Sequence, residues 1–122
     1  MGRAERRAFF SGDWVAYQTP STGGIPTLAA IRLEGQTLRS GIISIKNLSG
    51  TGLQDFIRFR AQSLSVAKAF GASEAQIFGG AFINQELEAS LLRVGFRPST
   101  GVVPDALGGG TMEILSRVYP IR

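Results

Sequence analysis

The sequence predicts an α/β fold of the mixed α+β kind, a single domain with one central mixed sheet and two main helices packed on it. Three observations support this prediction. The 122 residues suit one domain. Hydrophobic residues make up 43% and charged residues 18%, which is typical of a globular chain. Short apolar segments of strand character alternate with two segments of helical periodicity, so the helices need a sheet face on which to bury their apolar stripes.

The first half of the chain predicts three strands and a hairpin. The strands are expected at 13–18, 27–33 and 37–46. Proline and glycine place a loop at 20–26, and Glu34-Gly35-Gln36 is a turn that joins the second and third strands. Gly41, inside the third strand, indicates a β-bulge.

The clearest predicted helix covers 53–70. Its expected apolar stripe is Leu53, Phe56, Ile57, Leu64 and Ala67, and its expected polar face is Asp55, Arg58, Gln62 and Ser65. Thr51 followed by Gln54 is a capping-box start, and Gly71 is expected to end the helix.

The second half predicts a strand, a helix and two more strands. The strands are expected at 75–83, 102–103 and 112–118, with a glycine-rich loop at 105–111. Asn84 caps a helix over 85–94 that Gly95 ends, and Phe96 is expected to fold back onto Leu91.

The termini suggest two further features. Residues 1–12 form a basic arm ahead of a domain at 13–122, and Arg3, Arg6, Arg7, Phe9 and Phe10 predict a frayed terminus, with a nucleic-acid or partner-binding segment as the alternative. The last strand, at 112–119, is expected to offer an edge for pairing if a homodimer forms, with Gly108-Gly109-Gly110 letting it reposition.

The composition excludes several chemistries. The chain has no cysteine and no histidine, which rules out disulfides, thiolate or imidazole zinc sites, cysteine nucleophiles and histidine-based triads. No apolar run is long enough to predict a membrane span, and the basic start is followed by no secretory pattern, so we expect a cytoplasmic protein. Of 13 basic residues only Lys46 and Lys68 are lysines, and the net charge is +4. This balance leaves nucleic-acid binding open.

One segment combines the residues that a phosphate site needs. Asn47-Leu48-Ser49-Gly50-Thr51-Gly52 lies between a predicted strand and the start of the longest helix. Glycines let backbone approach a ligand, and unpaired helix N–H groups attract anions. The segment lacks the Gly-Lys-Ser/Thr ending of a Walker loop and the third glycine of a dinucleotide fingerprint. A strand-to-helix turn with a capping box is the purely structural alternative.

Together with the second helix, this segment resembles the GNAT N-acetyltransferase family. The family's phosphate motif is matched in spacing by Asn47, Gly50 and Gly52, and its later Asn and Gly-Phe pair by Asn84, Gly95 and Phe96. The resemblance covers 13–122 in element order and is most specific over 47–96. It extends to truncated GNAT-like domains at the ends of bacterial polymorphic-toxin and Rhs-type proteins.

The resemblance implies direct transfer of an acetyl group from acetyl-CoA, or of another acyl group from its CoA thioester, to an amine acceptor. The pantetheine arm would lie between two splayed parallel strands, the pyrophosphate on the N–H groups of Ser49 to Gly52, and a backbone N–H near Ile45 would polarise the thioester carbonyl. The cofactor-binding residues implied are Ile45, Asn47, Leu48, Ser49, Gly50, Thr51, Gly52 and Asn84.

The sequence also departs from the family. Asn47 replaces a longer Arg or Gln, Leu91 occupies the position of the tyrosine acid, and the N-terminal lobe that shapes the acceptor pocket is missing. Carboxylates that could serve as a base are Asp13, Glu34, Asp105 and Glu113, and the tyrosines that could supply an acid are Tyr17 and Tyr119, each with a structural role as the alternative. A non-catalytic GNAT-like module that binds a protein partner or a CoA-like ligand is therefore the alternative function, with a basic nucleic-acid-binding domain as the third.

Overall fold

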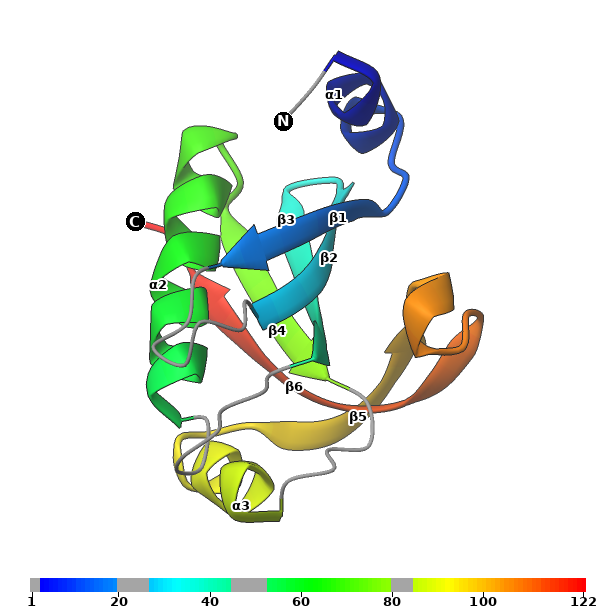
Figure 1. Cartoon of the computed structure of the whole chain (residues 1–122). Coiled ribbons are helices and arrows are strands. Elements are labelled where there is room, and N and C mark those ends of the chain that lie inside the picture. Colours follow the sequence, from blue (N-terminus) through cyan, green and yellow to red (C-terminus); the bar gives the residue numbers. More distant parts are fainter. Residues whose placement is uncertain (1–2, 20–26, 45–52, 80–84) are drawn as a thin grey trace.

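The computed structural model describes residues 3–19, 27–44, 53–79 and 85–122. Six strands form one mixed sheet in the order β1-β2-β3-β4-β6-β5. The elements follow one another as α1 Arg3–Phe10, β1 Val15–Thr19, β2 Thr27–Glu34, β3 Thr37–Ser44, α2 Leu53–Ala69, β4 Glu74–Gly79, α3 Gln85–Arg93, β5 Arg97–Val102, the short 3₁₀ helix η1 Asp105–Leu107, and β6 Thr111–Pro120. The predicted α+β domain with one mixed sheet and two main helices is therefore confirmed (Figure 1).

The sheet contains one parallel pair. β1, β2 and β3 are antiparallel neighbours, and β3 then pairs in parallel with β4, from Thr37 opposite Glu74 to Ile42 opposite Gly79. β6 pairs antiparallel with β4 on one side and with β5 on the other. A parallel pair needs a crossover connection, and α2 supplies it. The interior position of β6 leaves β5 as the edge strand, so the expectation that the last strand offers a free edge for a dimer is wrong.

Both predicted helices are confirmed to within a residue at each end, including their C-terminal stops. Gly71 and Gly95 have positive φ angles of 74° and 100°. After Gly95, the Phe96 N–H donates to the Leu91 carbonyl at 3.0 Å, and both side chains are fully buried in one cluster. This is the apolar contact that the sequence predicts for such a stop.

The apolar stripe of α2 differs from the predicted one. Phe56 and Phe59 are buried against the sheet together with Ser63, Ala67 and the carboxylate of Asp55, whereas Ile57 is 44% exposed. The expected placement of Ile57 inside and Asp55 outside is therefore wrong. The face of α2 that carries the two phenylalanine rings packs on the sheet, because burying these rings removes the largest apolar area from water.

The N-terminal segment is ordered by an aromatic contact. Phe9 is fully buried in a core cluster, and its ring centroid lies 4.7 Å from that of Phe70, at the end of α2. The expected frayed terminus is therefore replaced by α1, which packs on the domain through Phe9.

Two details of the strands also correct the sequence analysis. β5 covers 97–102, whereas only 102–103 was expected, because Pro98 and Gly101 hide its strand character and are tolerated at a sheet edge. The bulge falls at Ile43, where the β2–β3 register shifts, and not at Gly41. Gly41 instead faces the ring of Phe78 on β4, so its missing side chain makes room for that ring.

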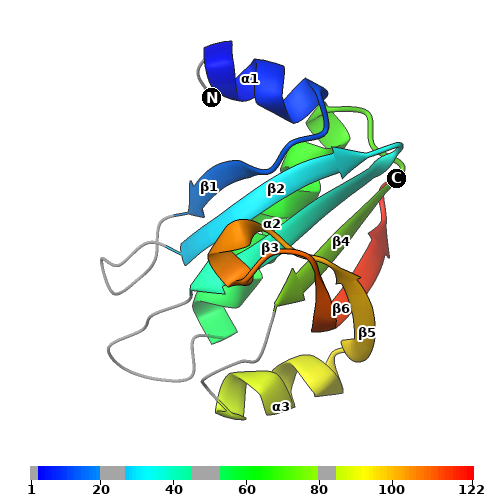
Figure 2. The same ribbon diagram turned by 90° about the vertical axis from the view of Figure 1, so that its right-hand side faces the viewer.

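The two faces of the sheet carry different cores. α2 and α3 cover the larger core, built around Ile42, Phe56, Phe59, Ile77 and Leu91. On the opposite face, Phe78, Val103 and Ile114 pack with Trp14, Leu107 and Met112. Figure 2 shows how β5, η1 and β6 curl over this second face, with α2 behind the sheet. None of the described helices is long and apolar enough to span a membrane.

We predict that Gly41→Ala lowers the free energy of unfolding by about 1–3 kcal/mol, because a Cβ there would lie 2.6 Å from the Phe78 Cζ atom. Urea denaturation measures the loss. In a Phe78→Leu background the same substitution should cost clearly less, since the ring that it meets is gone. Equal losses in the two backgrounds would contradict the proposed close contact.

Candidate functional site

The ends of four elements meet at one edge of the sheet. β3 and β4 are parallel and both end there, at Ser44 and Gly79, and the helices that follow them, α2 and α3, begin at the same end (Figures 1 and 2). In open sheets with parallel strands, ligands bind beyond the carboxyl ends of those strands, and helix N-termini attract anions. We call this the candidate edge.

The predicted cofactor residues fall between the described elements of this edge. Ile45, Asn47, Leu48, Ser49, Gly50, Thr51 and Gly52 belong to the connection from β3 to α2, and Asn84 to the connection from β4 to α3; all lie outside the described residues. The structure therefore shows only the strands and helices that flank these two connections. The cofactor-binding roles of the residues within the connections stay predictions.

The first turn of α2 carries a buried acidic group. Asp55 is fully buried and is the third residue of α2, which begins at Leu53. A carboxylate near a helix N-terminus is stabilised by the unpaired N–H groups and the helix dipole.

The sheet register separates the two tyrosines. Tyr17 lies opposite Ala29, which lies opposite Ile42, which lies opposite Gly79, so Tyr17 shares a row of the sheet with the end of β4. Tyr119 lies opposite Ala75, near the start of β4 and away from the candidate edge. The structure therefore brings only Tyr17 to the level of this edge.

Both tyrosines pack on the sheet, as the sequence analysis allowed. The Tyr17 ring lies 6.3 Å from that of Phe59, and its buried hydroxyl makes no hydrogen bond that meets normal geometry. Burial raises the pKa of Tyr17 above its ordinary value, although the nearby Gln62 side chain acts in the opposite direction. The hydroxyl is therefore protonated at neutral pH.

Two buried threonines extend the polar groups near this edge. Thr19 and Thr27 lie opposite each other at the end of the β1–β2 pair. Both side chains are buried, and neither Oγ1 atom has a hydrogen-bond partner. No sequence signal marks them, because threonine is an ordinary strand residue.

The other candidate residues do not assemble a catalytic group. Leu91 is fully buried in the core, so no polar group replaces the tyrosine of the family at that position. Asp13, Glu34, Asp105 and Glu113 are all exposed, and Glu34 lies at the β2–β3 turn, at the far end of β3 from the candidate edge. Within the described residues no three acidic side chains come together in a way that would hold a metal ion.

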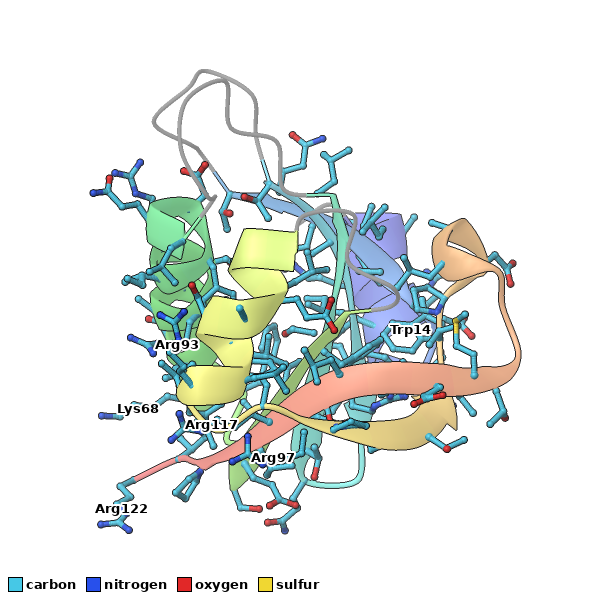
Figure 3. All side chains as sticks on the ribbon, turned by 90° about the horizontal axis from the view of Figure 1, so that it is seen from below. Trp14, Lys68, Arg93, Arg97, Arg117 and Arg122 are labelled. Carbon is cyan, nitrogen blue, oxygen red and sulfur yellow. The ribbon has the colours of Figure 1, made fainter. Side chains whose placement is uncertain are left out.

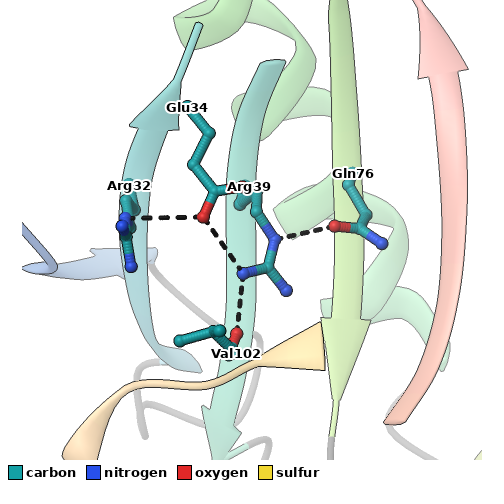
Figure 4. A network of polar contacts seen from close by, with 5 residues as sticks. All are labelled: Arg32, Glu34, Arg39, Gln76 and Val102. Atoms are coloured by element: carbon teal, nitrogen blue, oxygen red, sulfur yellow. Dashed lines mark hydrogen bonds and ion pairs between the residues drawn. The ribbon is translucent and has the colours of Figure 1, made fainter. Parts of the chain in front are cut away.

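Sequence reasoning missed the most connected polar side chain. Arg39, on β3, is buried on the second face of the sheet, where its Nε donates to the Gln76 Oε1 at 2.8 Å and its Nη1 to the Val102 carbonyl at 2.6 Å (Figure 4). The Glu34 carboxylate lies 3.6 Å from Nη1 and also pairs with Arg32. An arginine in a strand gives no signal that distinguishes a buried role from an exposed one.

Aromatic rings complete the surroundings of Arg39. Its guanidinium carbon lies 4.5 Å from the Phe78 ring centroid and 5.4 Å from that of Trp14. Burial lowers the pKa of Arg39, and the nearby Glu34 carboxylate acts against this shift. Because Val102 is the last residue of β5, the guanidinium ties the edge strand to β3 and β4 and holds the second core closed.

Comparisons of the chain with models of protein families, with curated proteins and with solved structures found no match.

We predict that Arg39→Met lowers the free energy of unfolding by about 3 kcal/mol, because it leaves the partly buried Val102 carbonyl and Gln76 amide oxygen without their charged donor. Urea denaturation measures the change. Arg58→Met, at an exposed position on α2, is the matched control and should stay within about 0.5 kcal/mol of the parent protein. Similar losses in both variants would contradict the structural role of Arg39.

Proposed function

We propose that this chain is an acyl-CoA-dependent N-acyltransferase domain of the GNAT type, which transfers an acetyl group to an amine acceptor. The observation that carries the proposal is the candidate edge: the parallel β3–β4 pair ends where α2 and α3 begin. Of the motif residues of the resemblance, Asn47, Gly50, Gly52 and Asn84 fall in the two connections that leave this pair, between β3 and α2 and between β4 and α3, and Gly95 and Phe96 follow α3. After α1, the strands and the two main helices follow one another as strand, strand, strand, helix, strand, helix, strand, strand, and this order also supports the proposal.

The proposed binding mode uses backbone groups more than side chains. When bound, acetyl-CoA supplies the acyl group as a thioester. The N–H groups of Ser49 to Gly52, at the start of α2, would hold its diphosphate, since glycines there leave the backbone open to a ligand. An N–H near Ile45, just after β3, would donate to the thioester oxygen as negative charge develops on it.

Tyr17 is the residue that best fits the proton donor. Transfer to an amine releases the CoA sulfur as a thiolate, which takes up a proton, while the amine loses one to a base or to water. Tyr17 is the tyrosine on the row of the candidate edge, and its phenol carries the proton that the thiolate takes up. Among the described residues at this edge no exposed side chain stands out as the base, so water is the proposed acceptor of the amine proton.

We predict that Gly50→Glu abolishes CoA binding, because it places a carboxylate where the diphosphate oxygens would lie. Calorimetry with CoA measures the loss, and thermal melts check folding. Ser65→Glu, which adds the same charge to an exposed position on α2, should bind CoA as the parent protein does. The cofactor site is refuted if the parent protein takes up no CoA at millimolar concentration.

We predict that Tyr17→Phe lowers the rate of acetyl transfer by about 100-fold and leaves CoA affinity unchanged, since it removes the proton donor and keeps the packing. Release of the CoA thiol in a mixture of amines can be followed with a thiol reagent, because the chain has no cysteine to react. Tyr119→Phe is the matched control, as its hydroxyl is also buried and unbonded but lies away from the candidate edge. Equal rates for the two variants would rule out Tyr17 as the donor.

A second candidate function is a GNAT-like module that binds its ligand or a protein partner without catalysis. Three observations favour it: Leu91 is buried where the family has its acid, β3 contains no carboxylate, and the acidic side chain of Asp55 is buried in the first turn of α2. CoA binding by calorimetry without transfer to any amine, tRNA or protein would select this function over the first.

A further inference from the structure

Five cationic side chains lie along one side of the molecule, from the row of Phe78 near the end of β4, which Arg97 shares, to the start of β4, beyond which Arg122 lies. Figure 3 labels them on one side of the molecule: Lys68, Arg93, Arg97, Arg117 and Arg122. Lys68 and Arg93 belong to the last turns of α2 and α3, whose first turns are at the candidate edge, and Arg122 follows β6 beyond Pro120, which lies opposite the first residue of β4. We call these five residues the basic surface.

None of these five cations forms an ion pair with an acidic side chain of the described residues. The two ion pairs of the described chain both use Glu34, with Arg32 and with Arg39, on the second face of the sheet. Lys68, Arg93, Arg97 and Arg122 are exposed, and Arg117 is partly exposed. The positive charge of this surface is therefore available to a partner.

Two of the guanidinium groups are held in place by the end of α3. Arg97 donates through Nη1 to the carbonyls of Leu92 and Phe96, at 2.8 and 2.6 Å, and Arg117 donates through Nη1 to the carbonyl of Val94. The last carbonyls of a helix attract cations, both as unpaired acceptors and through the helix dipole.

The surroundings of Arg117 fix it further. Its guanidinium carbon lies 4.5 Å from the Tyr119 ring centroid, and its side chain passes within van der Waals reach of Gly95, where any Cβ would touch it. Each guanidinium carries five N–H donors, so both arginines keep donors for a second partner after binding these carbonyls. A cation that is already ordered loses less side-chain entropy when it binds an anion.

We infer that the basic surface binds the phosphate backbone of a nucleic acid. This inference does not depend on the acyltransferase proposal. Four of the five cations are arginines, whose planar fork suits phosphate oxygens. A nucleic acid repeats its phosphates at regular spacing, so Arg97 and Arg117 can be engaged together with the exposed Lys68, Arg93 and Arg122.

The same surface predicts binding without base readout. Its one aromatic ring, that of Tyr119, is buried beneath Arg117, so no exposed ring is present for base stacking. Contacts to phosphate position a nucleic acid but carry no sequence information. We therefore expect affinity that depends strongly on salt and little on sequence.

The test measures binding of the whole chain to a fluorescent duplex DNA of mixed sequence across a range of salt concentrations. Five phosphate contacts predict a slope of log K against log salt of about −4.5, and Lys68→Gln combined with Arg93→Gln should make it shallower by about 2. Both substitutions leave Arg97 and Arg117 on the end of α3, and thermal melts check the fold. Arg3→Gln combined with Arg6→Gln is the matched control, because it removes the same charge from exposed positions on α1.

The inference is supported if only the Lys68 and Arg93 variant loses slope and affinity. It is overturned if the parent protein does not bind DNA at about 50 mM salt, where phosphate contacts are strong. It is also overturned if the α1 variant loses binding equally, which would assign the DNA to the N-terminal helix. Binding to vesicles of anionic lipid or to an acidic peptide, with none to DNA, would likewise overturn it.

Discussion

The parallel pairing of β3 with β4 places most of the other elements of this protein. Two neighbouring parallel strands cannot be joined by a tight turn, so the chain has to cross over between them, and α2 is that crossover. The crossover sets α2 against one face of the sheet, where Phe56 and Phe59 pack with Ile42 and Ile77 from the two strands. α2 begins at the edge at which β3 ends and carries the chain back to the start of β4. The parallel pairing of β3 with β4 therefore accounts for both the larger core and the candidate edge.

The second face of the sheet depends on a close fit between the same two strands. Gly41 and Phe78 are opposite each other in the parallel register, and the absent side chain of one makes room for the ring of the other. The guanidinium of Arg39 then lies on that ring and bonds to the last residue of β5. An arginine this deeply buried is stable only because hydrogen-bond acceptors and a nearby carboxylate surround it. The small second core is in this way closed by a polar group rather than by a helix.

Local sequence signals were sufficient for the elements whose stability is local. α2, α3 and the β2–β3 hairpin follow from periodicity and turn residues, and the stop at Gly95 with Phe96 on Leu91 follows from the chemistry of helix ends. What sequence could not supply depends on partners that are distant in the chain. β5 is a strand because β6 pairs with it, despite Pro98 and Gly101.

The same reasoning explains the residues that were misplaced. The burial of Asp55 depends on which face of α2 meets the sheet, and the burial of Arg39 depends on where β5 ends. Phe9 looks like part of a basic tail until the position of Phe70 is known. For the candidate site, the sequence supplies the glycine motif and the structure supplies the strand ends and helix starts that flank it. Placing Tyr17 on the row of the candidate edge requires the register of four strands, β1 to β4, which local sequence does not show.

The central claim, that the edge where β3 and β4 end is the ligand site, is tested most directly by amide chemical shifts recorded while CoA is added to the isotopically labelled protein. We predict that the largest shifts fall at Ser49 to Gly52 and at the residues that flank the two connections, Ser44, Leu53, Gly79 and Gln85. Shifts confined to the basic surface around Arg93 and Arg117 would show that CoA is attracted by charge alone. That result, or the absence of any shift at the four edge residues, would contradict the account.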